Sequence, residues 1–158
     1  LSPSMDIEVS SNFERLLFDL FGRDGAALAE QMVQFRKTKS LKLSPAQHAD
    51  FTALFAAHST DDAATLATIT RVYAETGMLL DPHTATGVAA TEALVPEGVT
   101  VTLATAHPAK FPEAVKQATG VTPPLPGTLA DLFERKETFG SLPKDVDALK
   151  AFVAGLTA

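Results

Sequence analysis

The sequence predicts a mostly α-helical segment of an α/β fold, with one β-strand near residues 99–105. Apolar residues recur at helical spacing over most of the chain, and a single β-branched run, VTVTL at 99–103, interrupts that pattern. A lone strand cannot pair its own backbone donors and acceptors, so its neighbours have to come from other residues. We therefore expect the 158 residues to be an incomplete domain, whose missing part precedes Leu1.

Each expected helix opens on a start signal that is followed by an apolar stripe. Ser11 and Glu14 form an S-x-x-E capping box, and Ser44 is followed by a proline at the first helical position. The predicted starts are, in chain order, Ser11, Asp24, Ser44, 59–62 and Pro82. Glycines at 22, 77 and 120 are expected to end helices.

The last third of the chain also contains helix start signals, separated by an expected loop. Pro108 and Pro112 frame the start of a helix over 113–119, directly after the predicted strand. A proline-rich loop is expected over 121–127, and two further helices over 129–136 and 145–153. The carboxyl end of a strand, just before a helix start, is where open α/β sheets bind ligands.

Composition narrows the class of protein. The net charge is −6, and lysines and arginines form no continuous patch beyond residues 36–39, so a nucleic-acid partner is not expected. No apolar run approaches the roughly 18 residues of a membrane span. The chain has no cysteine, which excludes disulfides and thiolate metal sites. These features favour a cytoplasmic protein without membrane contact.

Three separated motifs point to one family. They read SPSMDI at 2–7 with SSNFER at 10–15, LLDPHTA at 79–85, and LATAHPAKF at 103–111. Together and in this order they resemble the C-terminal part of threonine synthase, of the tryptophan synthase β-like fold type. The resemblance implies a lyase that uses pyridoxal 5'-phosphate to convert O-phosphohomoserine and water into threonine and phosphate. Members of the family are much longer than this chain.

The third motif carries the first candidate cofactor-binding residue. The resemblance implies that Thr105 sets a neutral hydroxyl against the pyridine nitrogen of pyridoxal phosphate, where relatives often read Thr-Gly-His and this chain reads Thr-Ala-His. His107 is then expected to orient the same loop. The alternative is that Thr105 caps the adjacent helix N-terminus.

The second motif supplies Asp81 and His83, which the resemblance places along the edge of the cofactor ring. Small residues follow them, including Gly87, and permit close approach of a flat cofactor or a neighbouring element. The alternative is an Asp81 helix cap with His83 pointing into water.

Asn12 and Arg15 are the candidate substrate-binding residues. They lie in the first turn of a predicted helix, where free N–H groups, a Ser-Ser-Asn cap and a guanidinium are suited to a phosphate. Equally open is a structural role, with Asn12 in the cap and Arg15 paired to Asp6 or Glu14.

No catalytic residue is assigned within the chain. The resemblance implies that the Schiff-base lysine and the glycine-rich phosphate loop both precede this region, and Lys110 is not that lysine. His48 and His58 match no carboxylate pattern and are expected at the surface, with no metal site.

Without the Schiff-base lysine, the chain alone is expected to be inactive and to need the rest of the same polypeptide. Its exposed apolar faces predict self-association. The alternative function is a non-catalytic helical interaction module.

Overall fold

A computed structural model describes residues 1–7 and 9–156 of the chain. They divide into two compact units, Leu1–Pro124 and Leu125–Ala158. The first unit contains the α-helices α1 (Ser11–Leu20), α2 (Gly25–Thr38), α3 (Pro45–Leu54), α4 (Asp62–Thr76), α5 (Pro82–Leu94) and α6 (Pro112–Thr119). It also contains two 3-10 turns, η1 (Pro3–Met5) and η2 (Pro108–Lys110). The second unit contains η3 (Gly127–Leu129) and α7 (Val146–Leu156).

Most helix boundaries follow the start and stop signals in the sequence. Asp24 caps α2 by accepting hydrogen bonds from two backbone N–H groups at 3.0 Å. Ser44 and Gln47 form a complete capping box at α3. Gly77 and Gly120 adopt the left-handed conformation that ends α4 and α6, as expected for glycine at this position.

The capping box predicted at Ser11 is wrong. α1 begins one residue earlier than that pattern implies, because Ser10 is its N-cap, and no side-chain hydrogen bond closes the cap. The amphipathic stripe still forms the helix: Leu17 is 1% exposed and faces α2, where Met32 is also buried.

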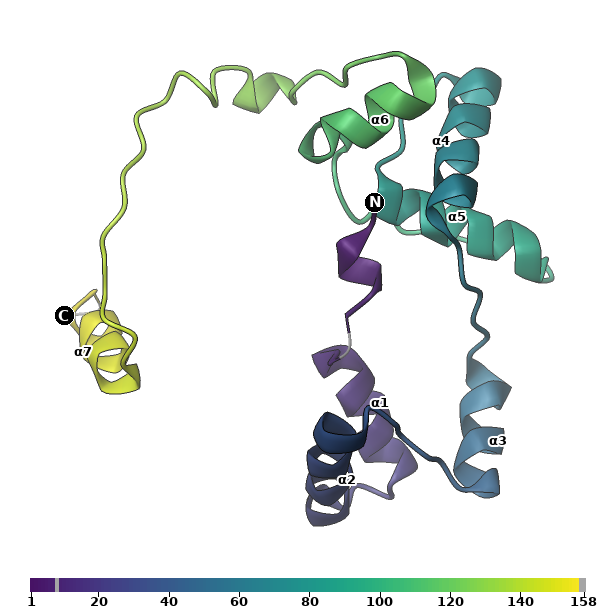
Figure 1. Cartoon of the computed structure of the whole chain (residues 1–158), viewed down its shortest axis with the longest axis vertical. Helices are drawn as coiled ribbons and strands as arrows, with labels where there is room; N and C mark the ends of the chain where they lie inside the picture. The colour runs from purple at the N-terminus through teal and green to yellow at the C-terminus, as the bar shows by residue number, and fades with distance from the viewer. Residues whose placement is uncertain (8, 157–158) are drawn as a thin grey trace. The chain divides into compact units, whose positions relative to one another are not determined.

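The core lies among α4, α5 and α6, and Figure 1 shows α4 beside both of the other helices. Ile69 of α4 is fully buried and clusters with Leu80 and Ala85. The Thr70 hydroxyl donates to the carbonyl of Ala118 at 2.8 Å, which ties α4 to α6. This packing fixes the start of α5, where the candidate site lies.

A charged cluster on the surface also links α4 to α5. Arg71 donates one hydrogen bond to Glu92 of α5 and another, at 2.9 Å, to Glu75 of its own helix. The hydrogen bond to Glu92 raises the pKa of Arg71 above its ordinary value. Since these side chains are substantially exposed, their contribution to stability is modest.

The predicted strand near 99–105 is absent: the residues that the structure describes contain no β-strand. Val99, Val101 and Leu103 are 98%, 78% and 74% exposed. A strand requires a neighbour for its main-chain hydrogen bonds, and no other part of the described chain supplies one. The β-branched pattern is present, but its partners are not.

The segment is nevertheless held against α5. The Thr102 and Thr91 hydroxyls are 3.2 Å apart. A Cβ added at Gly87 would lie 3.2 Å from the Thr102 methyl carbon, so the absence of a side chain allows this approach. Thr84, Gly87 and Thr91 share one face of α5 at helical spacing, and that face contacts residues 102 and 105.

The second unit has less regular structure than predicted. The helix expected over 129–136 is replaced by η3 and a run of turns, with hydrogen bonds such as Leu132 N–H to Leu129 O over three residues instead of four. None of its described residues is buried, and Phe133 is 87% exposed. A short helix with nothing to pack against has little to stabilise it. The predicted helix over 145–153 is present as α7.

Candidate functional site

The first turn of α5 is the most completely buried polar region of the described chain. Asp81 is its N-cap and Pro82 its first residue, a combination that favours helix initiation. Asp81 is 1% exposed, and its two carboxylate oxygens accept the backbone N–H groups of His83 at 2.9 Å and Thr84 at 3.3 Å. The predicted helix-cap role of Asp81 is therefore confirmed.

His83 points inward, so the predicted alternative of a water-facing side chain is wrong. It is 5% exposed, and its Nδ1 lies 3.1 Å from Asp81 Oδ1. Its Nε2 accepts the main-chain N–H of Ser4 at 3.3 Å, 79 residues away in the sequence. Since Nε2 accepts and Asp81 is an acceptor, a proton on Nδ1 satisfies both contacts.

Thr84 extends the network in the other direction. Its hydroxyl donates to Asp81 Oδ2 and accepts the main-chain N–H of Thr105 at 3.1 Å. Thr84 is 5% exposed. One buried carboxylate thus reaches two distant segments, Ser4 through His83 and Thr105 through Thr84. We call Asp81, His83 and Thr84 the α5 network.

An aromatic ring covers one side of the α5 network. Phe111 lies against the His83 ring with centroids 4.5 Å apart. Lys110 places its ammonium group 5.9 Å from the Phe111 ring centroid, at an exposed position. The Phe111 ring helps to keep water from the imidazole, which strengthens the hydrogen bonds within the network.

Thr105 and His107 stand outside the buried network. Thr105 is exposed, and its hydroxyl has no hydrogen-bond partner among residues 1–7 and 9–156. His107 is the N-cap of η2, where its Nδ1 accepts the Ala109 N–H at 3.2 Å. The alternative in which Thr105 caps the adjacent helix is wrong, because Phe111 is the N-cap of α6 and no side-chain hydrogen bond closes that cap.

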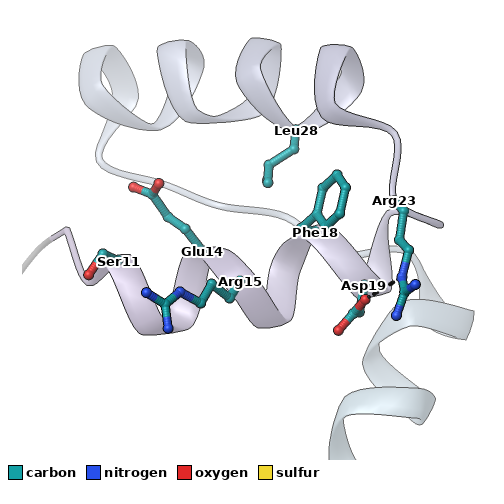
Figure 2. Close-up of a pocket in the computed structure, with 7 residues that line it drawn as sticks. All are labelled: Ser11, Glu14, Arg15, Phe18, Asp19, Arg23 and Leu28. Atoms are coloured by element: carbon teal, nitrogen blue, oxygen red, sulfur yellow. Dashed lines mark hydrogen bonds and ion pairs between the residues drawn. The ribbon is translucent and has the colours of Figure 1, made fainter.

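Asn12 and Arg15 lie on α1 and are both exposed; Asn12 is in the first turn, as predicted, and Arg15 comes directly after it. Arg15 lines an open hollow of about 470 Å³ whose other lining residues are Ser11, Glu14, Phe18, Asp19, Arg23 and Leu28. Figure 2 shows the Arg15 guanidinium and the Arg23–Asp19 pair at opposite ends of this group. Asn12 does not line the hollow.

The structural role predicted for this pair is not found. In the part of the chain that the structure describes, neither Asp6 nor Glu14 forms an ion pair with Arg15. The side chain of the N-cap residue Ser10 accepts no hydrogen bond, so Asn12 is not part of a side-chain cap either. The Arg15 guanidinium therefore remains available to an anion.

Sequence reasoning missed Thr84, the main chain of Ser4, and Phe111. The contact between Thr84 and Asp81 had a local signal, because a hydroxyl three residues after an N-cap can reach back to it, as the side chain of a capping box does. The contacts to Ser4 and Thr105 depend on tertiary packing and had none.

Three further observations on the described residues bear on function. No group of three or more His, Cys, Asp or Glu side chains is arranged to hold a metal ion. His48 and His58 are both exposed. None of the helices over residues 1–7 and 9–156 combines the length and apolar character needed to cross a bilayer.

Comparison with known proteins gives consistent matches. The family described as threonine synthase, C-terminal, matches residues 84–153. The threonine synthase of Pseudomonas aeruginosa is 51% identical over 98% of this chain and 34% of its own length. That of Corynebacterium glutamicum is 33% identical over 99% of this chain and 34% of its own length. The crystal structure of pyridoxal phosphate-bound threonine synthase from Brucella melitensis superposes with a TM-score of 0.76 at 43% identity, covering 98% of this chain and 33% of that one.

The chain spans about a third of the length of the relatives it matches. The match to the Pseudomonas aeruginosa protein extends over nearly all residues of this chain. These findings confirm the predicted resemblance and identify the chain as a relative of the C-terminal part of threonine synthases.

Proposed function

We propose that this chain is the C-terminal portion of a threonine synthase and lines one edge of its active site. The whole enzyme would convert O-phosphohomoserine and water into threonine and phosphate in the cytoplasm, as a pyridoxal phosphate-dependent lyase. The observation that supports this most directly is the α5 network, which fixes the main chain of Thr105 while leaving its hydroxyl exposed and without a partner.

The described residues fit one edge of pyridoxal phosphate and leave the rest to other parts of the protein. An exposed neutral hydroxyl on an anchored loop suits a hydrogen bond to the pyridine nitrogen. The sequence holds no glycine-rich loop for the phosphate group, and Lys110 lies over Phe111 at the surface. Residues outside this chain would supply the phosphate cradle and the Schiff-base lysine.

Pyridoxal phosphate, when bound, supplies the electron sink for elimination and replacement chemistry. Thr105 would hold the ring nitrogen with a neutral hydroxyl and so leave it largely unprotonated. Asp81 and His83 would act from behind this edge, since both are buried in the α5 network. His107 would fix the direction of the loop through its cap on η2.

Arg15 would bind the phosphate of the substrate. It is exposed, lines an open hollow, and has no carboxylate partner among the described residues. A guanidinium can bind a phosphate with two parallel hydrogen bonds. Asn12, three residues earlier on the same helix, is exposed and would add an amide donor from outside the lining of that hollow.

The test is cofactor binding and product formation by the full-length protein that contains this chain. We expect pyridoxal phosphate to give an absorbance band shifted from that of the free cofactor, and threonine to form from O-phosphohomoserine. A protein that bound neither cofactor nor substrate, yet captured a helical protein partner, would instead support the interaction module.

A further inference from the structure

The α5 network contains a threonine that the proposed function leaves without a role. We propose that Thr84 is a positioning residue. Its buried hydroxyl connects the Asp81 carboxylate to the main-chain N–H of Thr105, and this connection sets where the Thr105 hydroxyl lies. This inference rests on the proposed function, because the role of Thr105 toward the cofactor comes from there. Its geometric part can be measured separately.

The hydroxyl of Thr84 has both of its functions occupied. It donates its one proton to Asp81 Oδ2 and accepts the Thr105 N–H at 3.1 Å. Because the proton points to the carboxylate, an oxygen lone pair remains for Thr105. The Asp81 charge polarises the hydroxyl, which makes its oxygen a stronger acceptor. Thr105 is thereby tied to a buried carboxylate that it does not touch.

The carboxylate is itself held firmly. Asp81 Oδ1 accepts the backbone N–H of His83 and contacts its Nδ1, and Oδ2 accepts the backbone N–H of Thr84. It cannot rotate toward Thr105 without losing these bonds. The position of Thr84 Oγ1 is therefore set by the first turn of α5.

A second contact defines the direction of the segment that leads to Thr105. Thr102 lies against Gly87 and Thr91, on the same face of α5 as Thr84. The segment is held at residue 102 by packing and by the contact between the Thr102 and Thr91 hydroxyls, and at residue 105 by a hydrogen bond. Only the contact at residue 105 involves the α5 network, and Thr84→Val removes its acceptor without a large change in side-chain volume.

The chain offers a matched control for that substitution. Thr86 is two residues further along α5 and is similarly buried, with 8% exposure. Its hydroxyl donates to the His83 carbonyl at 2.8 Å, within the same helix. Thr84→Val and Thr86→Val therefore each remove one hydrogen-bonded hydroxyl from a buried site on α5, but only the first removes the acceptor of the Thr105 N–H.

The first measurement is hydrogen exchange of the Thr105 amide in the full-length protein, which does not depend on activity. We expect Thr84→Val to speed this exchange about tenfold or more, because the amide loses its acceptor. Thr84→Ser keeps the hydroxyl and is expected to restore protection, and Thr86→Val to leave it within about twofold. Equal protection of the Thr105 amide in Thr84→Val and wild type would overturn the proposal.

The second measurement is a double-mutant cycle on turnover and on the spectrum of bound pyridoxal phosphate. We expect Thr84→Val to lower kcat about five- to tenfold and to shift the spectrum, with little change in KM. If Thr84 acts through Thr105, adding Thr84→Val to Thr105→Ala lowers kcat further by less than about twofold. Losses that multiply fully would contradict the proposal, as would a Thr84→Ser variant that fails to recover activity.

Different results would contradict the proposed function and the role of Thr84. If the wild-type full-length protein bound no pyridoxal phosphate, the proposed function would fail, and the role of Thr84 toward the cofactor with it. If the wild type bound the cofactor and turned over while Thr84→Val matched Thr86→Val in both measurements, the role of Thr84 alone would be wrong.

Discussion

His83 Nδ1 lies 3.1 Å from Asp81 Oδ1, and both side chains are almost fully buried at the first turn of α5. The aspartate therefore caps a helix and holds an imidazole with the same carboxylate. Either role alone would tolerate substitution at moderate cost. Their combination makes Asp81 the residue on which the local structure depends most.

We expect Asp81→Ala to destabilise the protein by about 2–4 kcal/mol, because it removes a cap and leaves buried donors on His83 and Thr84 unsatisfied. Asp61→Ala is the matched control. Asp61 also caps a helix, α4, but it is exposed and its side chain accepts one N–H, from Ala64 at 2.8 Å. Its loss should cost about 1 kcal/mol. Thermal unfolding of the full-length variants checks the order, and equal losses would show that the buried contacts add nothing.

The surroundings of Asp81 also show which structural features can be predicted from the sequence and which cannot. The Asp81 helix cap was predictable, as were those of Asp24 and Ser44, because a cap depends on a few neighbouring residues. The burial of His83 was not, since its acceptor contact is with Ser4, 79 residues away. The predicted strand is absent for a related reason. The β-branched pattern is a local feature of the sequence, whereas strand pairing requires a neighbouring strand and so depends on tertiary structure.

Thr105→Ala is expected to weaken cofactor binding or turnover by about 1 kcal/mol, the value of one neutral hydrogen bond, or roughly fivefold. Thr105→Asp should do more harm to reaction specificity, because a carboxylate would favour a protonated ring nitrogen. Titration with pyridoxal phosphate and analysis of side products check these outcomes. Wild-type behaviour of both variants would leave Thr105 without a role at the cofactor.

Arg15→Ala is expected to raise KM for O-phosphohomoserine about tenfold or more, since a charge-assisted pair to phosphate would be lost. Arg23→Ala provides the comparison. Arg23 lines the same hollow, but its guanidinium pairs with Asp19 at 2.9 Å. Steady-state kinetics should show the increase for Arg15 only. An unchanged KM with a lowered melting temperature would instead favour a structural role for Arg15.

In the second unit, the Arg135 guanidinium hydrogen-bonded to Asp131 lowers the pKa of that carboxyl below its ordinary value. A lowered pKa in the folded state means that the pair stabilises the fold above the unfolded pKa, and that this effect is lost as pH falls through the folded value. We expect Arg135→Gln to return the Asp131 pKa toward its ordinary value, as measured by carboxyl NMR titration. No change on substitution would exclude the pair in solution.

The isolated chain exposes apolar groups that a longer protein would cover. Leu54, Val99 and Phe133 are 78%, 98% and 87% exposed. Such surface drives association, so sedimentation should detect dimers or larger species of the 158-residue chain. Two charged substitutions show which exposed surface drives the association: Leu54→Glu on α3 and Val99→Glu in the segment predicted as a strand. A chain that stayed monomeric at high concentration would contradict the expectation.

The most direct test of the central claim compares phosphate release from O-phosphohomoserine by the full-length protein and by the 158-residue chain alone, each supplied with pyridoxal phosphate. We expect steady release by the full-length protein and none by the chain, because the proposed Schiff-base lysine would lie outside these residues. Release by the chain alone, with contaminating full-length enzyme excluded, would contradict the account and would require a catalytic lysine within these residues, for which Lys110 would be the first candidate.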